Sequence, residues 1–119
     1  MLKEKTRAYS AKTTGKKNLS TSFSVPPKSA FYFYTNIGAP TGQFASSLEE
    51  FSDKLKSVNV ASIEFHMQRG DFENWVKGVF HNYKLAERLK VVKSLGLKGD
   101  KLRDAVYEEV KRNMLIHPN

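Results

Sequence analysis

The chain has 119 residues, of which 39% are apolar and 12% aromatic, and it carries a formal net charge of +8 with no cysteine. This composition favours one globular domain, because the chain is too short for two well-formed cores. The lack of cysteine excludes disulfides, thiolate catalysis and cysteine-ligated metal sites, and no apolar run is long enough to predict a membrane span.

Residues 1–29 form a basic segment that is poor in core-forming residues. They hold seven Lys or Arg against one Glu, a net charge of +6, whereas residues 30–119 hold 13 basic and 11 acidic side chains, a net charge of +2. Apolar residues in the segment follow neither the strand nor the helix period, and Pro26 and Pro27 favour an extended approach. We therefore expect an extended arm over 1–29, disordered in isolation, followed by a small globular α+β domain over 30–119.

The next stretch, SAFYFYTNIGAPTGQFAS, predicts a β-hairpin. Four consecutive aromatics favour a strand, and the glycines and proline of GAPTG predict a turn before a short return strand in QFAS. Alternation places Phe31 and Phe33 on one face of the strand and Tyr32 and Tyr34 on the other. The aromatic run FYFY is a candidate for a platform that stacks RNA bases, but we favour packing, since a hairpin between helices would have both faces buried.

About five short helices are predicted after the hairpin, at SSLEEFSDKLKSV, VASIEFHMQRG, FENWVKGVF, YKLAERLKVVKSL and KLRDAVYEEVKRNML. Each shows apolar residues at helical spacing. The predicted N-caps are Ser47, which forms a capping box with Glu50, and then Asp71, Asn82 and Asp100. The expected fold class is α+β and mostly helical, with an N-terminal β-hairpin packed on the helices and preceded by the extended basic arm.

The stretch FHMQRGDFENWV has the highest density of chemically active side chains. His66, Arg69, Asp71 and Trp75 could converge at one helix junction, with His66 and Asp71 as an acid/base pair and Arg69 holding an anion. We favour a structural interpretation, in which Asp71 caps a helix, Trp75 fills the core, and His66 and Arg69 satisfy polar groups at the kink. The three histidines lack metal-ligand spacing, so we expect no catalytic residue, metal or cofactor.

Three stretches, AFYFYTNIGAPTGQFASSLEEF, ASIEFHMQRGDFENWV and LAERL, carry a family resemblance. Residues 30 to about 113 resemble an archaeal and bacterial domain family of unknown function, and FHMQRGDFENWV is the most specific block. The resemblance implies no catalytic residues. The basic arm resembles the extensions of ribosomal proteins, in which a disordered segment becomes ordered through contacts with RNA phosphates.

These features predict a non-catalytic, ribosome-associated or ribosomal RNA-binding protein, archaeal and cytoplasmic, with no secretory signal. Its expected partners are ribosomal RNA and neighbouring ribosomal proteins, with no membrane and no small-molecule substrate. The predicted RNA-binding residues of the arm are Lys3, Lys5, Arg7, Lys12, Lys16, Lys17 and Lys28. Additional contacts are considered at Arg69, Lys77, Lys84 and Arg88, although interspersed glutamates favour a solvated helix face. The alternatives are a nucleoid-type DNA-binding protein and a regulatory adaptor whose body binds a protein.

Overall fold

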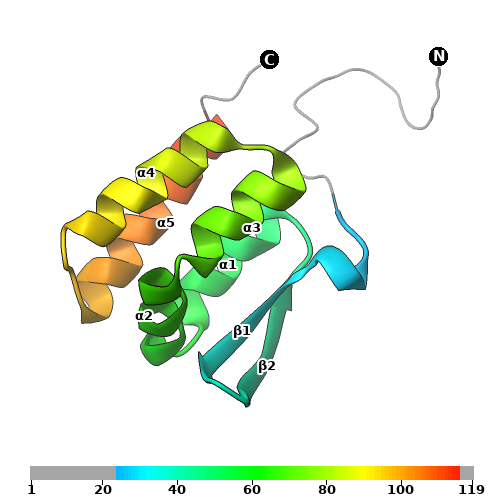
Figure 1. The fold of residues 1–119 in the computed structure, drawn as a ribbon, viewed down its shortest axis with the longest axis horizontal. Helices are drawn as coiled ribbons and strands as arrows, with labels where there is room; N and C mark the ends of the chain where they lie inside the picture. Colours follow the sequence, from blue (N-terminus) through cyan, green and yellow to red (C-terminus); the bar gives the residue numbers. More distant parts are fainter. Residues whose placement is uncertain (1–23, 116–119) are drawn as a thin grey trace.

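The structure, a computed structural model, describes residues 24–115 (Figure 1). A single 3₁₀ turn and an antiparallel two-stranded sheet precede the helices in these residues, which confirms the α+β, mostly helical fold. The elements are η2 (Pro27–Ser29), β1 (Phe31–Asn36), β2 (Ala39–Ala45), α1 (Leu48–Ser57), α2 (Val60–Arg69), α3 (Asp71–Phe80), α4 (Tyr83–Ser94) and α5 (Gly99–Leu115). Within this described part, no helix combines the length and apolar character needed to cross a membrane.

The hairpin turn is tighter than the sequence suggested. β2 begins at Ala39, so only Ile37 and Gly38 connect the strands, and Gly38 has the positive φ of 72° that such a turn requires. Pro40 lies within β2, opposite Tyr34, and not in the turn as expected. A proline is tolerated there because β2 is an edge strand of a two-stranded sheet.

One face of β1 forms part of the core. Phe31 and Phe33 are buried, and the ring of Phe33 stacks on that of Phe51 from α1 with centroids 5.9 Å apart. The centroids of Phe51 and Phe72, from α3, lie 5.0 Å apart, so the same cluster joins the hairpin to two helices. The alternation predicted for β1 is thus confirmed on its phenylalanine face.

The expectation that both faces of the hairpin are buried is wrong. Tyr32 is 45% exposed and Tyr34 is only partly buried. The helices gather on one side of the hairpin, so they cover one face of the sheet and one edge of β1 (Figure 1). An aromatic surface consequently remains on the outer side of the strand.

The predicted helix caps are confirmed at two of four sites. Ser47 Oγ accepts from the backbone N–H of Glu50, and Asn82 Oδ1 accepts from that of Leu85. The N-caps expected at Asp71 and Asp100 are wrong, because both residues lie inside the first turn of their helices.

Gly70 accounts for the error at Asp71. With φ of 78°, Gly70 both ends α2 and directly precedes α3, so no residue remains between the helices to serve as a side-chain cap. Asp71 is therefore already helical, and its carboxylate turns back toward α2.

Residues 25–29, which we expected to belong to the arm, lie against the domain. Val25 is buried and donates its N–H to Ser46 O at 2.8 Å. Trp75 Nε1 donates to Ser29 O at 2.7 Å, and the Tyr32 hydroxyl donates to Pro27 O at 2.6 Å. The domain packing thus extends at least to Val25, whereas residues 1–23 of the expected arm lie outside the described residues.

His81 ends α3 in an unfavourable backbone conformation. Its φ of 56° makes it the one non-glycine residue with positive φ among residues 24–115. Because glycine adopts this region without a Cβ clash, we expect His81→Gly to raise the free energy of unfolding by roughly 0.5–1 kcal/mol in urea denaturation. Gly70→Ala is the matched control and should lower the free energy of unfolding. Alanine is strained at the φ of 78° found at Gly70, and its Cβ would also meet Glu73 Oε2 at 3.2 Å. A loss of stability in His81→Gly would contradict this account.

Candidate functional site

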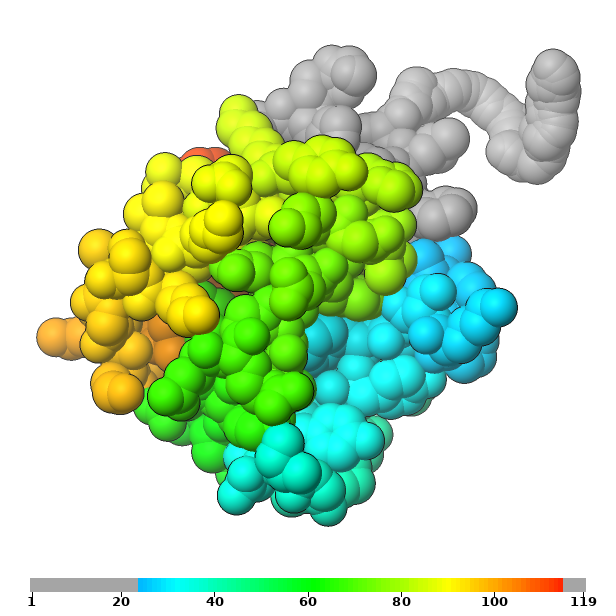
Figure 2. Space-filling view, in the orientation of Figure 1, coloured from blue at the N-terminus to red at the C-terminus, as the bar shows by residue number. Residues whose placement is uncertain are grey.

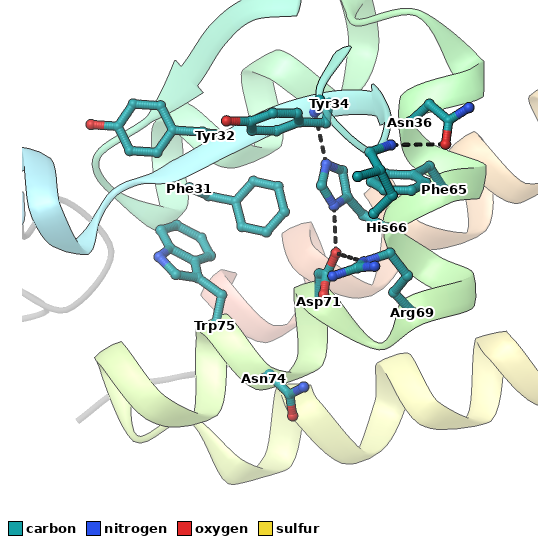
Figure 3. Close-up of a pocket in the computed structure, with 12 residues that line it drawn as sticks. Phe31, Tyr32, Tyr34, Asn36, Phe65, His66, Arg69, Asp71, Asn74 and Trp75 are labelled. Atoms are coloured by element: carbon teal, nitrogen blue, oxygen red, sulfur yellow. Dashed lines mark hydrogen bonds and ion pairs between the residues drawn. The ribbon is translucent and has the colours of Figure 1, made fainter. Parts of the chain in front are cut away.

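A pocket of about 550 Å³ opens between β1 and the helices α2 and α3. The hairpin, coloured cyan to teal, lies directly beside the green α2 and α3 on the face in Figure 2. The pocket's aromatic lining includes Tyr32 and Tyr34 from β1, Phe65 from α2 and Trp75 from α3 (Figure 3). Its charged lining consists of Arg69 and Asp71, from the junction of the two helices.

His66, Asp71 and Arg69 form one hydrogen-bonded cluster at this junction, which confirms their predicted convergence. His66 Nδ1 lies 2.7 Å from Asp71 Oδ2, and Arg69 Nε donates to the same oxygen at 2.9 Å. His66 Nε2 accepts from the backbone N–H of Tyr34 at 2.8 Å. That acceptor role assigns the ring proton to Nδ1, so a neutral imidazole donates to Asp71.

Burial keeps this imidazole neutral. His66 is 4% exposed, and its desolvation lowers the pKa below the ordinary value of 6.5, although the hydrogen bond and charge of Asp71 act in the opposite direction. Both ring nitrogens are engaged, so Nε2 can accept a substrate proton only after the bond to Tyr34 is broken. This geometry fits a residue that fixes β1 against α2 better than a general base.

Sequence reasoning missed the role of Tyr34 in the cluster. His66 satisfies a polar group at the Gly70 kink as expected, through Asp71, but its Nε2 also accepts from a strand N–H 32 residues earlier in the chain. No local pattern signals that pairing. Phe65 was also missed: the Arg69 guanidinium carbon lies 5.1 Å from the centroid of its ring.

Trp75 is buried as predicted, and it joins three parts of the domain. Only 8% of it is exposed, and its ring centroid lies 5.2 Å from that of Phe51 in α1. Its indole N–H holds Ser29 just before β1. Trp75 is therefore part of the core and also part of the pocket wall.

The other basic residues that were predicted or considered as RNA contacts differ in their surroundings. Lys28, Lys77 and Lys84 are exposed on η2, α3 and α4. Arg88 instead joins two helices, because its guanidinium donates to both carboxylate oxygens of Glu109 in α5, at 3.2 and 3.1 Å. This pairing also raises the pKa of Arg88. The remaining predicted RNA contacts lie outside the described residues: Lys3, Lys5, Arg7, Lys12, Lys16 and Lys17.

Fold and site together define a small α+β domain with a hydrogen-bonded His–Asp–Arg cluster beside an aromatic pocket. In the part of the chain that the structure describes, no group of three or more His, Asp or Glu is placed to hold a metal ion. The chain belongs to the family of unknown function DUF5752, whose sequence model matches residues 28–115. No curated protein and no solved structure matches it.

Proposed function

We propose that this protein is a non-catalytic RNA-binding protein that associates with the ribosome in the cytoplasm. The basic arm contacts the RNA backbone, and the domain docks on RNA or on neighbouring ribosomal proteins. The observation that carries the proposal is the distribution of charge. Residues 1–23 hold six of the 20 Lys and Arg and one acidic residue. Charge gathered at one end of a chain suits a polyanion better than a general need for solubility.

The described domain supports a binding role over a catalytic one. Its buried histidine is held between Asp71 and the Tyr34 N–H, and this arrangement stabilises structure without leaving a free base. The last helix, α5, carries the exposed carboxylates of Asp104 and Glu108, whose charge disfavours insertion into a DNA groove. RNA is therefore preferred to the DNA-binding alternative.

Salt dependence tests the role of the arm. If it neutralises about five phosphates, log affinity for structured RNA should fall against log salt concentration with a slope of roughly −3.5 to −4.5. A chain that starts at Ser24 should show a much flatter slope while it keeps the helical signal and melting temperature. The truncation is placed there because Val25 and Ser29 are hydrogen-bonded to the domain.

Two variants that remove the same charge show whether RNA binding depends on lysines of the arm or only on the total charge of the protein. Lys16→Ala with Lys17→Ala should weaken RNA binding without changing sequence preference, since backbone contacts position a protein and do not specify a sequence. Lys98→Ala with Lys101→Ala removes the same charge from exposed sites on the domain and should have little effect.

Ribosomal association is tested by co-sedimentation with ribosomal subunits at moderate salt. The full chain should pellet with a subunit, and the chain from Ser24 should not. Equal pelleting of both would assign the association to the domain and remove the arm from the mechanism. Tighter binding of duplex DNA than of structured RNA at equal salt would favour the nucleoid-type alternative instead.

A further inference from the structure

The outer side of the hairpin presents a fixed aromatic surface next to the pocket. The rings of Tyr32 and Phe44 face each other across the strands with centroids 5.7 Å apart, and both are exposed. The Tyr32 hydroxyl donates to Pro27 O, which holds that ring in place. Tyr34 follows on the same strand and lines the pocket itself (Figure 3). Clustered exposed aromatics of this kind indicate a partner, whereas single exposed rings need no explanation.

Arg69 presents a positioned guanidinium at the same pocket. Its Nε donates to Asp71 and its plane lies near the Phe65 ring, yet 49% of the side chain is exposed. Among the described residues, only Nε of this guanidinium has a hydrogen-bond partner. Its terminal N–H groups have the planar geometry that pairs with phosphate oxygens. Asp71 locally offsets the positive charge of Arg69. A contact with phosphate therefore depends on the geometry of its hydrogen bonds more than on long-range electrostatic attraction.

The pocket also lies beside residues 27–29, which connect the basic arm to the domain. Trp75, in the pocket wall, bonds Ser29, and Tyr32 bonds Pro27. A polyanion held by the arm is therefore brought close to this opening. A volume of about 550 Å³ falls within the usual range for sites that enclose a ligand the size of a nucleotide.

From these observations we propose that the pocket binds one unpaired nucleotide of single-stranded RNA, with its base stacked on the tyrosines of β1 and its phosphate at Arg69. This inference rests on the proposed RNA-binding function and adds to it a preference for single strands. Stacking suits any base, because every base has a flat π face, so the site selects strandedness over sequence.

Trp75 provides a direct readout, because it is the one tryptophan of the chain and it lines the pocket. The probes are a single-stranded RNA of about 12 nucleotides and its duplex form, titrated into the full chain. We expect the single strand to change the emission of Trp75, and the duplex to bind through the arm without that change. Anisotropy of labelled RNA measures total binding in parallel.

Matched variants locate the contact. Tyr32→Leu and Tyr34→Leu keep apolar volume but remove the flat ring, and each should weaken single-strand binding about tenfold. Tyr83→Leu, at a 59% exposed tyrosine of α4, should leave affinity unchanged. Arg69→Gln should weaken binding and reduce the salt slope by about one, whereas Arg112→Gln, at a 57% exposed arginine paired with Glu109, should change neither.

Failure of this inference is distinguishable from failure of the proposed function. RNA binding by anisotropy with no change at Trp75, and equal affinities for the Tyr32 and Tyr83 variants, would overturn the pocket alone. Absence of RNA binding by the full chain would overturn both. A change in Trp75 emission on removal of residues 1–23, with no response to RNA, would assign the pocket to the protein's own arm and also overturn the inference.

Discussion

Replacing Trp75 with alanine is expected to lower the free energy of unfolding by about 3–5 kcal/mol, the range for large-to-small changes in a core. The indole packs against Phe51 and Phe80, with ring centroids 5.2 and 5.0 Å away. Its N–H also holds Ser29 O, which ties the residues before β1 to α3. Urea denaturation followed by far-ultraviolet circular dichroism measures the change without relying on the tryptophan itself.

Trp75→Phe separates packing from the hydrogen bond. This variant keeps an aromatic ring in the core but loses the hydrogen-bond donor to Ser29. Its free energy of unfolding should therefore fall by about 1–2 kcal/mol, less than in Trp75→Ala. If Trp75→Ala unfolded like the parent protein and lost only ligand binding, the residue would belong to an exposed site and not to the core.

Replacing His66 with alanine is expected to cost about 2–4 kcal/mol at neutral pH. The change removes a buried ring whose centroid lies 4.7 Å from that of Phe31. It also leaves the Tyr34 N–H without its acceptor and Asp71 without one of its two donors. Thermal and urea denaturation at pH 7 measure the loss, and an unchanged stability would contradict the assigned role of the cluster.

The same residue should make stability depend on pH. Burial lowers the pKa of His66 in the folded state. Below pH 6.5 the unfolded chain therefore binds a proton at His66 more readily than the folded protein does. The contribution of His66 to the free energy of unfolding is therefore complete above pH 6.5. It is lost as the pH falls from 6.5 toward the lower pKa that His66 has in the folded state. The loss can reach about 1.4 kcal/mol per pH unit within that window.

An exposed histidine serves as the control for this pH dependence. The loss of stability below pH 6.5 should vanish in His66→Ala. It should persist in His81→Gly, because the histidine replaced in that variant lies on the surface. Protonation of His66 would also place a second N–H against the Tyr34 N–H, so β1 should loosen first. The protection factor of the Tyr34 amide, which is its exchange rate relative to the intrinsic rate at each pH, measures that step, and a protection factor that rises on acidification would contradict it.

Local sequence patterns were sufficient for much of the fold. The aromatic alternation predicted the buried face of β1, and side-chain capping at Ser47 and Asn82 predicted where α1 and α4 begin. The burial of Trp75 followed from its size and its apolar neighbours. These features depend on interactions within a few residues or on the strong preference of large apolar side chains for burial, so they are visible in the sequence. The gathering of charge in the first residues is likewise a property of composition alone.

Only the tertiary structure decided the site. The bond from the Tyr34 N–H to His66 spans 32 residues, and no periodicity specifies which strand amide meets which histidine. Asp71 has the residue type and position of a cap, but the left-handed Gly70 joins two helices without a linker and turns that carboxylate to His66 and Arg69. Tyr32 remains exposed because helices cover a single face of the hairpin. Such outcomes depend on how distant elements pack, and packing is set by the whole core and not by any one segment.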